Sequence, residues 1–273
     1  MAVTQHDKAV RFRALHEGEA FVIPNPWDAG SARMLEALGF PALATSSGAQ
    51  AGVLGRRDGR VTRDEALAHC RLIVDAVDVP VSADLEKGFG DAPEAVAETI
   101  RLAAGVGLVA CSIEDATGDP ARPLYDLARA RERVAAAVRA ARDLPFPFVI
   151  TGRTENFLRP NPSLEDTIAR LRAFEEVGAD VLMAPGLPDL AAVKAVCAAV
   201  GKPFNFMAGI KGKSFTVPEL AAAGVKRISL ATSLYRMAIT GAHEAAREVK
   251  EQGTFGYIDR SLATSDMLRF LQP

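Results

Sequence analysis

Acidic side chains and one arginine follow several short apolar segments of the chain, and together they could hold a metal ion. Asp84 and Glu86 follow the third such segment, Glu114 ends the fourth and Arg153 follows the fifth. Carboxylates at close range repel one another unless a cation lies among them. Oxygen ligands without His or Cys nearby suit a hard cation. These residues therefore predict a Mg²⁺ site, with Mn²⁺ as the alternative ion.

Arg153 is the expected cationic partner of this acidic group. It can clamp a substrate carboxylate through two N–H groups or stabilise an enolate. An ion pair with Glu155 or Glu114 is the alternative role. For Asp28 and Asp115, capping of the next helix is an equally good interpretation, because acids favour helix starts.

Eight apolar segments position these residues. Each segment is preceded by Gly or Pro punctuation or followed by a helix-period pattern, and Gly suits the C-cap of the preceding helix. Eight such units predict an α/β fold, a (β/α)8 barrel whose active site lies at the carboxyl ends of the strands. Gly105-x-Gly107-x-x-Ala110 precedes a strand, which argues against a dinucleotide-binding sheet. The expected strands are 20–23, 42–44, 80–83, 108–111, 147–150, 181–183, 203–206 and 227–230, and the expected helices include 62–77, 93–104, 127–141, 163–177 and 233–251.

The barrel domain is expected to span residues 1–250. The remaining residues, 251–273, form a C-terminal helical tail in which 259–271 is helical. This tail is surplus to eight βα units, so we expect it to pack on a partner subunit.

Composition excludes several classes of protein. The chain has 273 residues, a net charge of −2, 49% hydrophobic residues and 6% aromatic residues. A nucleic-acid-binding protein usually carries an excess of positive charge, which this chain lacks. No apolar run reaches the length that a membrane-spanning helix needs. The basic run 129–142 is interpreted as a solvated helix face.

The cysteines and histidines also limit the chemistry. Three cysteines without a C-x-x-C pair favour a cytoplasmic protein. The four histidines (His6, His16, His69 and His243) are expected at the surface or the edge of the core.

Several motifs in fixed order carry a resemblance to a known family. The most specific are D-x-E-x-G-x-G at 84–90 and S-I-E-D at 112–115; the others lie at 24–33, 44–48, 54–59, 152–155, 184–186 and 227–230. With these motifs the chain resembles the isocitrate lyase/phosphoenolpyruvate mutase superfamily from about Phe12 to Ala242.

The resemblance implies a role for each matching residue. Asp84 would bind Mg²⁺ directly, Glu86 and Glu114 would hold metal-bound waters, and Asp58 would lie near metal and substrate. Arg153 would stabilise an enolate oxygen, while Ser47, Gly48 and Ala49 would hold the substrate carboxylate. Trp27 and Asn205, at the ends of the first and seventh strands, complete the expected substrate-binding set. The family also implies a homotetramer, a dimer of dimers that exchange a C-terminal helix.

The 116–125 loop departs from the family pattern. It carries neither the Cys loop of isocitrate and methylisocitrate lyases nor the K-x-N-S of the mutases. This argues against those activities, and leaves Tyr125 and Arg122 as candidate replacements for the general acid that the loop Cys supplies in the lyases.

The predicted function is a Mg²⁺-dependent lyase that cleaves a C–C bond next to a 2-oxo acid, or decarboxylates it, through a metal-bound enolate. Its substrate would be a small 2-oxo or 2-hydroxy carboxylate. The alternatives are P–C bond chemistry on phosphonopyruvate or phosphoenolpyruvate, and a non-catalytic barrel that binds 2-oxo acids.

Overall fold

Eight parallel strands form a barrel in which every strand pairs with its neighbours, except that the first and second strands do not form a ladder. The computed structural model describes residues 3–271, so the first two and last two residues of the predicted domains lie outside it. At the gap the Ala44 amide still donates to the Pro24 carbonyl, at 3.0 Å. The strands are β1 (Phe21–Ile23), β2 (Leu43–Ala44), β3 (Val81–Asp84), β4 (Ala110–Glu114), β5 (Val149–Arg153), β6 (Val181–Met183), β7 (Phe204–Met207) and β8 (Arg227–Ser229).

The predicted (β/α)8 barrel is confirmed, and each strand lies within three residues of its predicted bounds. The main difference is that β4 and β5 begin about two residues and end about three residues later than the predicted ranges, so Glu114 and Arg153 are the last residues of their strands. These two residues pair in the ladder between the strands. The barrel backbone therefore fixes their relative position.

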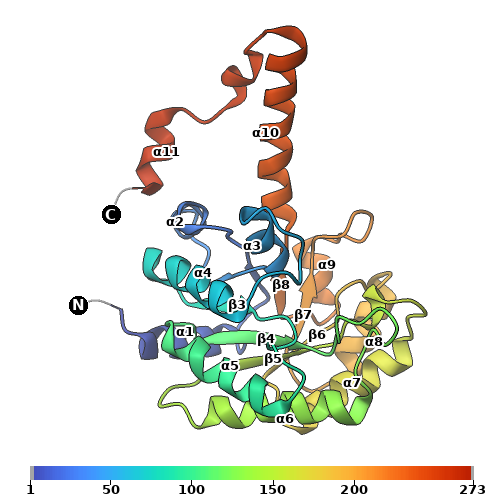
Figure 1. Cartoon of the computed structure of the whole chain (residues 1–273). Coiled ribbons are helices and arrows are strands. Elements are labelled where there is room, and N and C mark those ends of the chain that lie inside the picture. The colour runs from blue at the N-terminus through green and yellow to red at the C-terminus, as the bar shows by residue number, and fades with distance from the viewer. Residues whose placement is uncertain (1–2, 272–273) are drawn as a thin grey trace.

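Helices surround the barrel (Figure 1), and most of the α-helices begin at side-chain caps. Thr62 and Thr216 form capping boxes with Glu65 and Glu219, which satisfy backbone N–H groups that a helix start leaves without partners. The helices are α1 (Gln5–Leu15), α2 (Ala29–Ala37), α3 (Ser47–Val53), α4 (Arg63–Ala76), α5 (Pro93–Gly105), α6 (Leu127–Arg142), η1 (Asn156–Leu158), α7 (Leu164–Glu176), α8 (Leu190–Ala199), α9 (Val217–Ala222), α10 (Ser233–Gln252), η2 (Gly256–Arg260) and α11 (Thr264–Leu271).

Glycines end several helices as predicted, with one correction. Gly39, Gly178 and Gly224 have positive φ after their helices, where a side chain would be strained. Gly105, however, is the last residue of α5, and Gly107 takes the left-handed conformation instead. The chain therefore turns two residues later than the sequence indicated.

One helix that the sequence analysis did not predict packs on the amino-terminal end of the barrel. Phe12 of α1 is fully buried and joins a cluster with Ile23, Val149 and Val181, which come from three strands. This apolar layer closes the barrel at the end opposite the acidic side chains.

The described part of the predicted C-terminal tail, residues 251–271, stands away from the barrel together with α10, the helix that leads into it (Figure 1). Neither α10, η2 nor α11 contains a buried residue. The single helix expected over 259–271 is divided, because residues 261–263 separate η2 from α11. The last helix, α11, contacts α2, where Arg33 donates a hydrogen bond to the Leu271 carbonyl at 3.2 Å. Among residues 3–271, no helix has both the length and the apolar content that a membrane crossing requires.

Replacing Gly152 by Ala should destabilise the barrel beside the acidic site. A Cβ at this position would lie 2.8 Å from the Phe174 Cβ, so β5 or α7 must shift. We expect a loss of about 1–3 kcal/mol in the free energy of unfolding, measured by urea denaturation. The matched control is Gly105→Ala, whose Cβ meets nothing within 4 Å and which should not destabilise the protein. Equal losses in the two variants would contradict the packing argument.

Candidate active site

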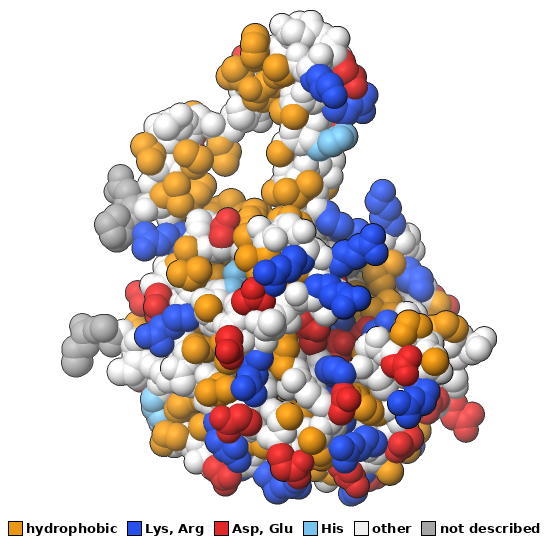
Figure 2. All heavy atoms as spheres, viewed as in Figure 1, with side chains coloured by type: hydrophobic (Ala, Val, Ile, Leu, Met, Phe, Trp, Pro, Cys, Tyr) orange, Lys and Arg blue, Asp and Glu red, His pale blue; other side chains and the backbone are white. Residues whose placement is uncertain are grey.

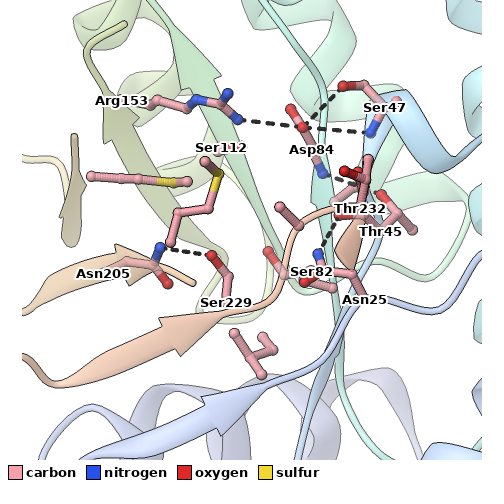
Figure 3. A pocket seen from close by; sticks show the side chains of 18 of the residues that line it. Asn25, Thr45, Ser47, Ser82, Asp84, Ser112, Arg153, Asn205, Ser229 and Thr232 are labelled. Carbon is pink, nitrogen blue, oxygen red and sulfur yellow. Dashed lines mark hydrogen bonds and ion pairs between the residues drawn. The ribbon is translucent and has the colours of Figure 1, made fainter. Parts of the chain in front are cut away.

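Asp84, the last residue of β3, lies at the centre of the polar site. Its Oδ2 accepts hydrogen bonds from the Ser47 hydroxyl at 3.1 Å and from Arg153 Nη1 at 3.3 Å. Figure 3 shows Ser47 and Arg153 reaching this carboxylate from opposite sides of the cavity. The Asp84 amide donates to Thr45 Oγ1 at 3.2 Å, which ties the ends of β2 and β3 together. Residues far apart in sequence thus converge on one carboxylate.

Glu86, two residues after Asp84, has an unusual backbone conformation. Its φ is +50°, in the left-handed region that non-glycine residues seldom adopt. Its amide donates to Asp84 Oδ1 at 3.1 Å, and its carbonyl accepts the Glu114 amide at 3.0 Å. Such strain persists where the surrounding structure determines the conformation, and it is common at functional sites.

Arg153 lies among three carboxylates and is nearly buried. Its guanidinium is 2.7 Å from Glu155, 3.3 Å from Asp84 and 3.4 Å from Glu114. Both ion pairs that the sequence analysis gave as alternatives are therefore present. Burial raises the pKa of Glu114 well above its ordinary value, while the charge of Arg153 opposes that rise. Arg159 bonds the other oxygen of Glu155 at 3.1 Å and extends the network toward solvent.

Two further carboxylates, Asp58 and Glu86, lie close enough to Asp84 for their negative charges to repel. Burial and the negative charges of Asp84 and Asp58 raise the pKa of Glu86 to about 7. Burial and Asp84 also raise the pKa of Asp58. A cation among these groups would offset the repulsion, and their oxygen-only chemistry fits a hard divalent ion. In residues 3–271 no three His, Cys, Asp or Glu side chains lie close enough to hold an ion by themselves, so water ligands would have to complete such a site.

Two cavities meet at this cluster. The inner one, of about 210 Å³, lies inside the barrel and has Asp84 and Asn205 in its wall. The outer one opens at the carboxyl ends of the strands and has Glu86 and Glu114 in its wall. Ser47, Asp58 and Arg153 line both cavities. Figure 2 shows acidic side chains in a hollow on this side of the molecule.

The predicted carboxylate-binding segment is the start of α3, and the structure places its three residues differently. Ser47 and Gly48 line the inner cavity, and a Cβ on Gly48 would lie 3.3 Å from Asp58 Oδ2. Ala49 is fully buried, does not line the cavity, and donates its amide to Ser46 Oγ at 3.5 Å. Trp27 also lies outside both cavities and packs its ring against Tyr235 at 5.9 Å.

Comparison with known proteins assigns the family. The model of the phosphoenolpyruvate phosphomutase family matches residues 12–250. The chain belongs to this family. It is therefore an enzyme of the carbon–carbon lyase type found in the isocitrate lyase/phosphoenolpyruvate mutase superfamily.

Three relatives show the breadth of this family. A Burkholderia cenocepacia J2315 crystal structure described as a lyase/mutase is 50% identical, with a TM-score of 0.96 over 98% of this chain and 97% of that one. Oxaloacetate decarboxylase of Paraburkholderia xenovorans LB400 is 31% identical over 82% of this chain and 76% of its own. The 2-methylisocitrate lyase of Escherichia coli K12 is 28% identical over 91% and 86% of the two chains.

The 116–125 loop, where the chain departs from the family motifs, folds back on itself and is held by hydrogen bonds. Ala116 pairs with Leu124, and Lys87 Nζ donates to the Thr117 carbonyl at 2.7 Å. The two candidate acids lie outside both cavities. The Tyr125 hydroxyl bonds Asp91, and burial raises its pKa to about 12, while Arg122 is largely exposed. The structure therefore does not bring either side chain to the site.

The other acids at strand ends have structural partners. Asp28 caps α2, since its Oδ1 accepts the Ser31 amide at 2.7 Å, as the capping interpretation predicted. Asp115 does not cap a helix. It is buried, accepts the Glu155 amide at 2.8 Å and pairs with Arg170 at 3.2 Å. Asp115 thus holds the segment that follows Arg153.

Two predictions about basic side chains are wrong. The run 129–142 is not wholly solvated, because Arg133 is buried and donates to the carbonyls of Lys87, Gly90 and Asp91 behind the Glu86 turn. His16 is buried rather than at an edge, and its ring contacts Arg227 inside the barrel. A charged residue within an otherwise apolar strand was the signal for Arg227, since a buried charge requires partners.

Proposed function

We propose that the chain is a Mg²⁺-dependent lyase, able to use Mn²⁺, that cleaves the C–C bond next to a 2-oxo acid or decarboxylates it through an enolate. The observation that carries this proposal is the convergence of Asp84, Ser47 and Arg153 on one cavity wall. The relatives named oxaloacetate decarboxylase and 2-methylisocitrate lyase support the reaction class. The substrate would be a small 2-oxo or 2-hydroxy carboxylate.

Each residue of the site would have a distinct role. Asp84 would bind the ion directly, while Glu86 and Glu114 would hold its water ligands. When bound, the ion would supply Lewis-acid polarisation of the 2-oxo group. Ser47 and Gly48 would orient the substrate carboxylate, and Asp58, which lines both cavities, would lie near the ion and the substrate.

Arg153 would stabilise the negative charge that develops on the enolate oxygen. Three carboxylates already fix its guanidinium, so little reorganisation is needed during the reaction. Neither Tyr125 nor Arg122 is placed to protonate the product. We therefore infer that the enolate carbon takes its proton from water in the outer cavity. In a decarboxylation this is sufficient, because CO₂ leaves without a proton and only the enolate carbon has to be protonated.

A substrate screen tests this function. Purified protein is incubated with oxaloacetate and substituted malates, and pyruvate or glyoxylate formation is followed with Mg²⁺ and with EDTA. Turnover that requires Mg²⁺ is expected. Phosphate release from phosphonopyruvate would favour P–C chemistry instead, although the loop lacks the mutase motif. Tight oxalate binding without turnover on any of these compounds would favour a non-catalytic barrel.

We further propose a cytoplasmic homotetramer whose dimers exchange the C-terminal tail. Exposed apolar side chains on α10, η2, α11 and the segment between α10 and η2 support this proposal, and Figure 2 shows apolar side chains on this projecting part of the molecule. The residues are Met237, Ile239, Val249, Phe255, Ile258, Met267 and Leu268. A solitary subunit would leave this surface in water, whereas a second copy could cover it.

Replacing Ile258 by Glu should weaken this assembly. The side chain is 56% exposed in the single subunit, so the subunit fold should tolerate the change. Light scattering after gel filtration should show the wild type at four times the 29.0 kDa chain mass and the variant as smaller species. The control is Lys250→Glu, a charge change in the last turn of α10, directly before the tail. A monomeric wild type would contradict the proposal.

A further inference from the structure

Arg227 of β8 lies inside the barrel at the inner cavity, and the proposed reaction gives it no role. The residue is only 4% exposed, yet it lines the same cavity as Asp84 and Ser47. Its partners come from β5, β7 and the segment after α1, so its guanidinium lies across the barrel interior.

All three hydrogen-bond partners of Arg227 are neutral. Its Nε donates to Asn205 Oδ1 at 2.8 Å, and Nη2 donates to Thr151 Oγ1 at 2.8 Å. Nη1 lies 3.3 Å from His16 Nε2. His16 Nδ1 is 2.9 Å from the Phe12 carbonyl and donates to it, which leaves Nε2 as the acceptor for Arg227. Burial and the charge of Arg227 lower the pKa of His16 to about 3, so the ring is uncharged at neutral pH.

The two arginines of the cavity therefore differ in charge balance. Arg153 has three carboxylates within 4 Å, whereas Arg227 has none among the described residues. A buried cation without a counter-charge is unfavourable, because burial removes its hydration. Hydroxyl and amide groups surround it, notably Asn205 and Ser229, whose side chains face each other in Figure 3.

The free hydrogen-bonding capacity of Arg227 also favours an anion. A guanidinium has five N–H groups, and the three neutral partners engage one each. Two N–H groups on the terminal nitrogens remain for a ligand. A carboxylate accepts such a pair well, and it would supply the missing negative charge.

We propose that Arg227 determines substrate specificity by binding a second carboxylate at the base of the inner cavity. The inference rests on the proposed function, in which the first carboxylate and the 2-oxo group lie near Ser47 and Asp84. The substrate class is thereby narrowed to 2-oxo or 2-hydroxy dicarboxylates short enough to fit one barrel interior. Monocarboxylates would leave Arg227 without a counter-charge and bind weakly.

Calorimetric titration with two matched ligands tests this inference without turnover. L-malate and L-lactate share a 2-hydroxy carboxylate and differ in the second carboxylate. In Mg²⁺ the wild type should bind L-malate about 10- to 100-fold more tightly than L-lactate. Arg227→Gln should lose that preference but retain its affinity for oxalate. Retained oxalate binding would show that the proposed metal site around Asp84 is intact. Equal binding of malate and lactate by wild type would overturn this inference alone, whereas no binding of oxalate would overturn the proposed function.

A second pair of variants keeps the test decisive if Arg227→Gln fails to fold. Ser229→Asp places a carboxylate at the next inward position of β8, and Ser229→Asn is its neutral control of equal size. Ser229→Asp should raise the thermal midpoint relative to Ser229→Asn, because the buried guanidinium gains a counter-charge. It should also weaken L-malate binding about 10-fold or more relative to Ser229→Asn, with L-lactate little changed. Equal malate affinity in the two Ser229 variants would overturn the proposal.

Discussion

Asp84→Asn is expected to lower Mg²⁺-dependent turnover by about 10³-fold or more, the largest loss for any single substitution at the site. The change removes the carboxylate on which Ser47 and Arg153 converge. It leaves the volume of the side chain almost unchanged. It also removes a charge that raises the pKa of both Asp58 and Glu86, so the free energy of unfolding should change little. The loss would therefore come from metal binding rather than from folding.

The test combines activity with direct measurement of metal binding. Turnover is measured over a range of Mg²⁺ and Mn²⁺ concentrations, and ion binding is followed by calorimetry. The control is Asp28→Asn, which also lies beyond a strand end but caps α2, a role that Asn fills equally well. Full activity of Asp84→Asn, or activity of the wild type in EDTA, would contradict the metal-dependent mechanism.

The sequence predicted the barrel well because the barrel follows from local signals. Gly and Pro mark the strand starts, and helix periodicity lies between the strands, so each element could be assigned without long-range information. The rule that parallel strands share one carboxyl edge then brought Asp84, Glu114 and Arg153 together. The tail was less predictable, since residues 261–263 interrupt a pattern that is helical by composition.

Partners of charged residues could not be predicted in the same way. Asp115 and Asp28 look alike in sequence, yet one binds Arg170 in the interior and the other caps a helix. Arg133 and His16 were misplaced because burial depends on what packs against a helix, and the sequence analysis did not predict α1 at all. The role of Trp27 was similarly beyond reach, because its neighbour Tyr235 is more than 200 residues away.

Arg153→Met is expected to lower both turnover and stability. Turnover should fall about 10²- to 10³-fold, because the developing enolate charge loses its fixed cation. The free energy of unfolding should fall by roughly 3–5 kcal/mol, because Glu114 is left buried without a cation and Glu155 keeps only Arg159. Urea denaturation and steady-state kinetics measure the two losses. The control, Arg71→Met, breaks an exposed pair with Asp75 on α4 and should cost less than about 1 kcal/mol.

A second substitution separates the two effects of Arg153. In Arg153→Met with Glu114→Gln, the unpaired carboxylate is neutralised, so part of the lost stability should return. Turnover should stay low, since no cation is restored near the enolate oxygen. The two changes act on groups 3.4 Å apart, so their unfolding free energies should not add. Strict additivity would show that Glu114 and Arg153 are not coupled, and recovered turnover would show that Arg153 acts only by holding its neighbours in place.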